Sequence, residues 1–254
     1  MQVSFIQSPL VWENPPANRD YFTSAIASVP VETNLIVLPE MFTSGFTMNP
    51  QAVAESMQGE TMQWLQLLAQ SRNCAITGSL VITEGDQYYN RLVFVYPSGA
   101  IQSYDKKHLF TLSGEHEVYT AGTEKVVVEY MGWRICPFIC YDLRFPVFSR
   151  NNVNYDLLLY VASWPKTRTN AWDILLQARA VENMCYTIGV NRIGTDANGY
   201  EYIGHSQAID FLGHTLVASN EAEGVFTTIL DKDALLETRQ KLNFLNDQDA
   251  FHLL

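Results

Sequence analysis

The sequence predicts a single α/β domain in which helices cover mixed β-sheets. About twelve strand-like apolar runs and about four helical patterns are distributed along the whole chain. No low-complexity linker or repeat divides residues 1–254, which favours one layered domain. Several neighbouring strands are joined by turns too short for a crossover, so purely parallel winding is a poor fit.

The first half of the chain alternates strands with two helices. Two prolines at 15–16 open the first helix, and Phe22, Ile26 and Val29 follow at helical spacing. The second helix contains Trp64 and Leu68. Residues 35–38 form a continuous apolar run, as expected for a strand covered on both faces. The other expected strands in this half span residues 3–7, 74–83, 91–96 and 100–104.

The second half contains more strands, and a long polar loop over residues 105–122 precedes it. Loops of this length inside a compact domain are usually functional. A short helix is expected after Pro146, a longer one around residues 172–181, and a polar one over 231–241. The expected strands span residues 125–130, 133–139, 157–161, 186–191, 207–211, 216–218 and 225–230.

Composition excludes several classes of function. A net charge of −11 argues against nucleic-acid binding, which depends on phosphate neutralisation by Lys and Arg. We expect no signal peptide and no membrane span, because the N-terminus lacks a basic, then apolar, leader and no long apolar run follows. Four cysteines are too few for a disulfide framework, and none forms a zinc-type CxxC pair. We therefore expect a cytoplasmic protein.

At three predicted strand ends, the apolar run is followed by a residue that can take part in acyl transfer. Glu40 follows the run at 35–38, Lys106 follows the strand that ends near residue 104, and Cys140 ends the strand at 133–139. A carboxylate can deprotonate a thiol, and an ammonium can stabilise the oxyanion that forms when the sulfur attacks a carbonyl group. If these ends share one edge of the sheets, a base, a cation and a nucleophile converge there.

Other interpretations of these residues remain open at this point. Taken singly, Glu40 and Lys106 could be solvated and Cys140 a buried core thiol. Two other kinds of enzyme remain possible: a metal-dependent hydrolase and a hydrolase with a papain-like Cys–His pair. A binding protein without catalytic activity is a third alternative. The candidate residues are His108, Glu115, His116 and Glu117 for a metal, and His205 or His214 for the pair.

The local sequences resemble the three signature blocks of the nitrilase superfamily of carbon–nitrogen hydrolases. The blocks are LPEMF at 38–42, YDKKHLF at 104–110 and ICYDLRFP at 139–146, in the order that the superfamily has them. The likeness extends from residue 1 to about residue 230. It implies a four-layer α-β-β-α sandwich, a Glu-Lys-Cys triad, and neither a metal nor an organic cofactor.

The resemblance also implies roles for individual residues. Glu40 would be the general base, Lys106 (rather than Lys107) the oxyanion-stabilising lysine, and Cys140 the nucleophile. The Tyr141 N–H would complete the oxyanion hole. Many members have a second glutamate seven residues before a glycine; Glu115 fits that spacing and Glu117 fits it less well. The reaction would pass through a thioester on the cysteine.

Within the superfamily, the sequence is most similar to the omega-amidase branch, which cleaves the terminal amide of short dicarboxylic monoamides such as 2-oxoglutaramate and 2-oxosuccinamate. Such a substrate has a carboxylate at its far end, so a cation should face the thiol. The candidates are Arg144, Lys166 and Arg168, although Arg144 could instead pair with Asp142 or Glu182. The alternative substrates are N-carbamoyl compounds, aliphatic amides and nitriles.

Two further expectations concern pocket walls and assembly. Phe42, Phe46 and Trp164 are candidate walls of the substrate pocket, although aromatic side chains at strand ends often belong to the core. The resemblance implies a homodimer or larger homo-oligomer. The C-terminal tail at about 242–254, with Phe251, Leu253 and Leu254, could lie at its interface.

Overall fold

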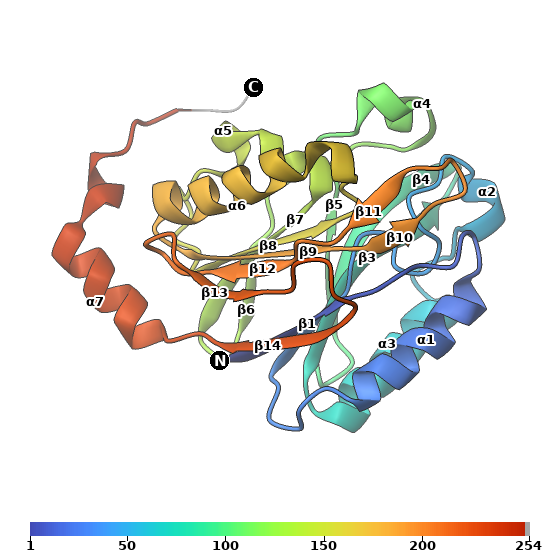
Figure 1. The fold of residues 1–254 in the computed structure, drawn as a ribbon, viewed down its shortest axis with the longest axis horizontal. Coiled ribbons are helices and arrows are strands. Elements are labelled where there is room, and N and C mark those ends of the chain that lie inside the picture. The colour runs from blue at the N-terminus through green and yellow to red at the C-terminus, as the bar shows by residue number, and fades with distance from the viewer. Residues whose placement is uncertain (252–254) are drawn as a thin grey trace.

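Two six-stranded β-sheets stack face to face in the computed structural model, which describes residues 1–251 (Figure 1). The first sheet has the order β14 (Gly224–Ile229), β1 (Gln2–Gln7), β2 (Leu35–Val37), β3 (Ala75–Glu84), β4 (Gln87–Val95), β5 (Ile101–Asp105). The second has the order β13 (Thr215–Ala218), β12 (Gln207–Ile209), β9 (Tyr186–Asn191), β8 (Leu157–Ala162), β7 (Trp133–Ile139), β6 (Val128–Tyr130). A separate hairpin pairs β10 (Ile193–Thr195) with β11 (Glu201–Ile203).

Both sheets combine a parallel centre with antiparallel flanks. Strands β1, β2 and β3 run parallel to one another, and so do β7, β8 and β9. The outer pairs, such as β3–β4 and β12–β9, are antiparallel. The short turns in the sequence therefore correspond to the antiparallel flanks, and the prediction of mixed sheets is confirmed.

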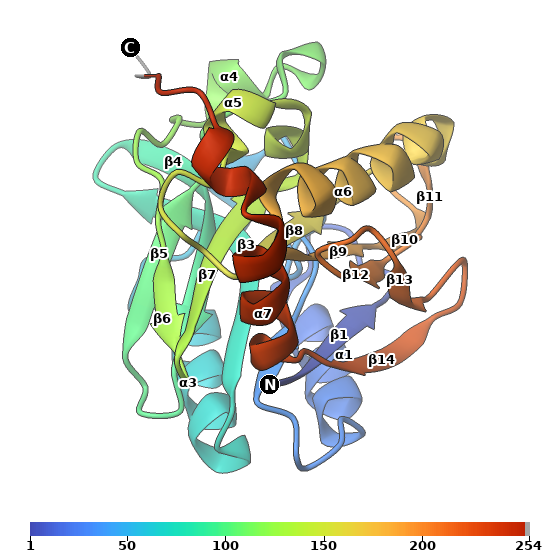
Figure 2. The same cartoon turned by 90° about the vertical axis from the view of Figure 1, so that its left-hand side faces the viewer.

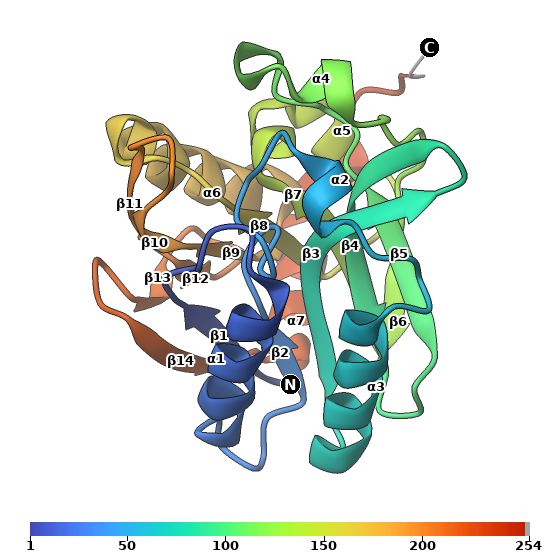
Figure 3. The same cartoon turned by 90° about the vertical axis from the view of Figure 1, so that its right-hand side faces the viewer.

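Helices cover the two outer faces, which gives four layers. Helices α1 (Pro15–Ala27) and α3 (Glu60–Arg72) lie side by side on the first sheet (Figure 3), and α6 (Thr169–Asn183) packs on the second (Figure 2). Helix α7 (Lys232–Leu242) lies at one end of the sheets in Figure 1. Three short helices are α2 (Pro50–Val53), α4 (Glu115–Val118) and α5 (Pro146–Ser149). No helix within residues 1–251 has the length and apolarity needed to cross a membrane.

Strand β2 shows how the sequence pattern builds these layers. Its side chains alternate between two sets of contacts, because successive residues of a strand point to opposite faces. Leu35 and Val37 pack between the two sheets, whereas Ile36 and Leu38 pack under the helices of the outer layer. The continuous apolar run is therefore explained by burial on both faces.

The structure differs from the sequence prediction at short elements. Hairpin β10–β11 was not predicted, because its strands span only three residues each and contain polar side chains. Helix α4 lies in the segment 105–122 that was expected to be a loop, and helix α2 was not predicted. Val29 lies beyond the end of α1, although it is buried. Leu253 and Leu254 of the C-terminal tail lie outside the described residues.

Asp156, the residue before β8, anchors helix α7 through its buried carboxylate. It accepts hydrogen bonds from Lys232 Nζ at 2.9 Å, Arg239 Nη1 at 3.2 Å and the Arg134 N–H at 3.0 Å.

Asp156→Asn should lower the free energy of unfolding by about 2 kcal/mol, measured by urea denaturation, because it weakens charge-assisted hydrogen bonds. Glu237→Gln, at an exposed site on α7, is the control and should change stability by less than about 0.5 kcal/mol. Equal stabilities of the two variants would contradict this role.

Candidate active site

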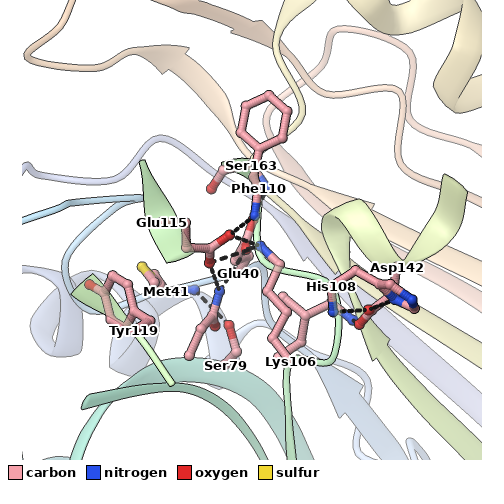
Figure 4. Close-up of polar contacts among 12 residues, drawn as sticks. Glu40, Met41, Ser79, Lys106, His108, Phe110, Glu115, Tyr119, Asp142 and Ser163 are labelled. Atoms are coloured by element: carbon pink, nitrogen blue, oxygen red, sulfur yellow. Dashed lines mark hydrogen bonds and ion pairs between the residues drawn. The ribbon is translucent and has the colours of Figure 1, made fainter. Parts of the chain in front are cut away.

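The three strand ends singled out by the sequence meet at one place. Glu40 follows β2 after two residues, Lys106 directly follows β5, and Cys140 directly follows β7. Lys106 Nζ lies 2.9 Å from Glu40 Oε1, and both side chains are almost fully buried (Figure 4). Lys106 and the partly exposed Cys140 line the same cavity. Two sheets therefore contribute to one cluster.

Glu115 completes the surroundings of the lysine. Lys106 Nζ lies 3.0 Å from each Glu115 carboxylate oxygen, and the Phe110 N–H donates to Oε2 at 2.5 Å (Figure 4). Glu117, the other glutamate considered from the sequence, is exposed. A glycine is required at position 122, where the segment after Glu115 returns to the end of β5, because a Cβ there would lie 2.2 Å from the Asp105 carbonyl oxygen.

Asn90 joins the two carboxylates and was missed by the sequence analysis. Its Nδ2 donates to Glu40 Oε1 at 2.8 Å and to Glu115 Oε1 at 3.3 Å. Its backbone carbonyl accepts the Lys106 N–H at 3.0 Å. The sequence offered one clue to Asn90: it is an amide in a strand, β4, in which the residues that follow it are mainly apolar. A buried amide there requires polar partners.

Cys140 occupies a sharp turn between β7 and a short 3₁₀ helix. Its φ is +46°, a left-handed conformation that costs a non-glycine residue roughly 1–2 kcal/mol. Asp142 holds this turn in place: it accepts the Ile139 N–H at 3.0 Å, the Tyr104 hydroxyl at 2.8 Å and the His108 N–H at 2.9 Å. These bonds connect the cysteine turn to the segment that carries the lysine.

Burial and charge set the protonation of the cluster. Burial disfavours the charged lysine, but the carboxylates of Glu115 and Glu40 outweigh it and raise the pKa of Lys106. Burial raises the pKa of Glu115, against the opposing effect of Lys106. Burial, followed by the negative charge of Glu40, raises the pKa of the Cys140 thiol well above its usual value, although Lys106 opposes this. The resting cysteine is therefore a protonated thiol.

The cavity above the thiol has a volume of about 750 Å³. Lys106, Cys140 and Ser163 are among the polar residues that line it. Its aromatic lining consists of Trp12, Phe46, Phe110, Tyr141, Trp164, Tyr200 and Tyr202. Lys106 Nζ lies 5.1 Å from the centroid of the Phe46 ring, so this side chain is both a wall and a neighbour of the buried cation.

Two arginines line the cavity, and neither forms an ion pair within residues 1–251. The Arg144 guanidinium lies 4.8 Å from the Trp164 ring centroid, and that of Arg168 lies 5.3 Å from the Phe110 centroid. The acids that could have paired with Arg144 are bound elsewhere: Asp142 contacts His108, and Glu182 contacts Arg179. Both guanidinium groups can therefore bind an anion in the cavity.

Two residues proposed from the sequence for the substrate pocket do not line it. Phe42 is fully buried under α1, with its ring centroid 5.5 Å from that of Phe22, so it belongs to the core. Lys166 is about half exposed, and its Nζ lies 3.1 Å from Glu201 Oε2. The reason is local: Trp164, Pro165 and Arg168 face the cavity, whereas the turn between them directs Lys166 to solvent.

The residues considered for a metal site or for a papain-like Cys–His pair form other contacts in the structure. His108 Nδ1 lies 2.8 Å from Asp142, and Glu115 binds Lys106. His205 and His214 contact Asp173 and Asp210, and neither histidine lines the cavity. No group of three side chains within residues 1–251 is arranged to hold a metal ion.

Hairpin β10–β11 supplies a wall that the sequence analysis did not identify. Asp196, at the turn, accepts the Tyr202 hydroxyl at 2.8 Å and the Tyr200 N–H at 3.0 Å. All three residues line the cavity. The aspartate therefore holds the Tyr202 side chain and the backbone of Tyr200 in place. The alternation at residues 200–202 was too short to indicate this.

A four-layer α-β-β-α sandwich with Glu, Lys and Cys at its strand ends has the architecture of a carbon–nitrogen hydrolase. The family model for carbon–nitrogen hydrolases matches residues 2–240, so the chain belongs to this family, and the resemblance to the nitrilase superfamily is confirmed.

Individual relatives cover nearly the full length of the chain. It is 44% identical to omega-amidase YafV of Yersinia enterocolitica, covering 100% of this chain and 99% of that protein. It is 30% identical to 2-oxoglutaramate amidase of Bacillus subtilis (strain 168), covering 96% of each. A crystal structure of a CN-hydrolase superfamily protein from Xanthomonas campestris, with an arsenic adduct in its active site, superposes with a TM-score of 0.98 at 43% identity, covering 100% of this chain and 99% of that one.

The raised thiol pKa predicts how Cys140 reacts with iodoacetamide. Because the thiolate is the reacting form, the alkylation rate should still rise with pH above about 8.5, the usual thiol pKa. In Glu40→Gln, loss of the negative charge should move the inflection to lower pH, since Lys106 remains. Mass spectrometry of the labelled protein gives the rate. Cys140→Ala is the control and should label slowly, because Cys74, Cys136 and Cys185 are buried. A wild-type plateau below about pH 8 would contradict the assignment.

Proposed function

We propose that the protein is a cysteine-dependent amidohydrolase that cleaves the terminal carboxamide of short dicarboxylic monoamides, of the 2-oxoglutaramate and 2-oxosuccinamate type, to acid and ammonia. One observation carries the proposal: Lys106 and Cys140 line the same cavity as two arginines that have no carboxylate partner within residues 1–251. The names of the relatives, omega-amidase and 2-oxoglutaramate amidase, support it.

Glu40 is the proposed general base, and its hydrogen bonds indicate which oxygen takes the proton. Oε1 already accepts from Lys106 Nζ at 2.9 Å and Asn90 Nδ2 at 2.8 Å. Among the residues that the structure describes, 1–251, only the Ser163 N–H donates to Oε2, at 2.7 Å. Since a carboxylate oxygen accommodates about two donors, Oε2 is the free acceptor for the Cys140 proton. The thiol is activated only as the proton leaves, because its resting pKa is high.

In the first half-reaction, the Cys140 sulfur bonds to the amide carbon as its proton passes to Glu40. The tetrahedral oxyanion is stabilised by the Lys106 ammonium and the Tyr141 backbone N–H. Glu40 returns the proton to the nitrogen, the carbon–nitrogen bond breaks, and ammonia leaves a thioester. In the second half-reaction, Glu40 deprotonates a water that attacks the thioester, which releases the acid and restores the thiol.

Glu115 is proposed to hold the lysine rather than to exchange protons with the substrate. It binds Lys106 Nζ through both oxygens and also accepts the Phe110 N–H. With Glu40 on its other side, the lysine is kept charged and directed at the oxyanion. Glu115 is thus a positioning residue of the cluster.

Arg144 and Arg168 are the proposed sites for the far carboxylate of the substrate. Each is stacked on an aromatic ring of the cavity, which orients the guanidinium and limits its exposure to water. A guanidinium can bind a carboxylate through two parallel hydrogen bonds. Trp164 and Phe110 would then pack against the carbon chain between the two ends.

We also propose that residues 1–254 act as one catalytic domain that forms a homodimer or larger homo-oligomer in the cytoplasm. The four cysteines are unpaired, which is typical of proteins in a reducing compartment and supports the proposed cytoplasmic location. The oligomer is proposed from the family resemblance, and size-exclusion chromatography with light scattering tests it.

Removal of either reacting group should abolish turnover of 2-oxoglutaramate. We expect Cys140→Ala to release no ammonia above background and Glu40→Gln to lose about 10³-fold in kcat, because each removes a step of proton or acyl transfer. Ammonia release measures the rate, and circular dichroism verifies the fold. An unchanged rate in either variant would exclude this mechanism. A wild-type preference for nitriles or N-carbamoyl compounds in the same assay would reject the substrate class.

The role of Arg144 predicts a selective loss for charged substrates. Glutaramate and pentanamide have the same length, but only glutaramate ends in a carboxylate. Arg144→Met should lower kcat/KM for glutaramate about 10- to 100-fold, because a charge-assisted contact is lost. The value for pentanamide should change less than about threefold. Lys166→Met, outside the cavity, is the matched control and should leave both values unchanged. Equal losses on both substrates would contradict carboxylate binding by Arg144.

A further inference from the structure

Ser163 has an unpartnered hydroxyl at the cavity. The residue directly follows β8 and is only 6% exposed. Its Oγ is buried and has no hydrogen-bond partner within residues 1–251, yet the residue lines the cavity together with Cys140 and Lys106. A buried hydroxyl without a partner is unfavourable, so such a group at a binding site indicates a partner that arrives with the ligand.

The backbone of Ser163 places this hydroxyl on the general-base side of the thiol. Its N–H donates to Glu40 Oε2 at 2.7 Å, and Figure 4 shows the residue next to Glu40. The same N–H also acts on the Cys140 sulfur, where it lowers the thiol pKa against the larger effect of burial. Ser163 is therefore adjacent to both the oxygen that takes the proton and the sulfur that attacks.

The two sides of the thiol bind different parts of a carboxamide. The carbonyl oxygen must face Lys106 and the Tyr141 N–H, where positive charge is available. The nitrogen must face Glu40, because it receives the proton there. Glu40 cannot satisfy both N–H groups of a primary amide, since Oε2 has one free acceptor position.

We propose that Ser163 Oγ accepts an N–H from the amide nitrogen of the substrate and is a specificity-determining residue for primary amides. This inference rests on the proposed amidase function but concerns the leaving group rather than the acyl group. The hydroxyl holds the nitrogen where Glu40 can protonate it, and ammonia leaves from that position. In the second half-reaction, the incoming water occupies the vacated place and donates to the same oxygen.

The test compares two substrates that give the same thioester. Glutaramate releases ammonia, whereas the monomethyl ester of glutaric acid releases methanol and has no N–H. Ser163→Ala should lower kcat/KM for the amide about 10- to 30-fold and for the ester less than about threefold, since only the amide loses a hydrogen bond. Ser163→Thr keeps the hydroxyl and should retain the amide rate within about threefold.

Each outcome is decisive. Equal losses on amide and ester, or no loss on either, would overturn the role of Ser163, and thermal unfolding of both variants identifies a loss of folded protein. A failure of Ser163→Thr alone to restore the amide rate would also count against it. If the wild type prefers a primary amide that is not a short dicarboxylic monoamide, the proposed acyl group is wrong. In that case, the role of Ser163 is tested by comparing the preferred amide with the methyl ester of the corresponding acid.

Discussion

The buried Lys106 ammonium between two carboxylates is the interaction on which the rest of the site depends. Glu40 and Glu115 each approach it within 3.0 Å, and Asn90 bridges the two acids. An uncompensated charge at this depth would be strongly unfavourable. The cluster therefore links the ends of β2 and β5 to strand β4, through Asn90, and to the segment 105–122, through Glu115.

The cysteine turn is fixed by a second polar group with a different task. Asp142 bonds to the backbone on both sides, at Ile139 and His108, and so couples the strained conformation of Cys140 to the lysine segment. Its hydrogen bonds offset the left-handed φ of the nucleophile. The lysine cluster thus sets the electrostatics, and the aspartate sets the geometry of the sulfur.

Sequence patterns predicted what depends on long apolar periodicity or on a recognisable block. The mixed sheets and the segments around Glu40, Lys106 and Cys140 are of this kind. These three residues could be located because each follows the end of an apolar strand. Contacts between distant segments left no such pattern. Asn90 and Ser163 are single polar residues whose meaning depends on what faces them, and Phe42 and Lys166 could be placed only by the direction of their side chains.

The split origin of the site has a consequence for how the two halves of the chain depend on each other. In the first half of the chain, Glu40 follows β2, Lys106 follows β5, and Glu115 begins α4. In the second half, Cys140 follows β7 and Ser163 follows β8, both in the other sheet. Neither half contains a base and a nucleophile together. Catalytic turnover therefore requires the two sheets to be packed in the correct relative position. A small shift of one sheet against the other would abolish activity while both halves keep their secondary structure.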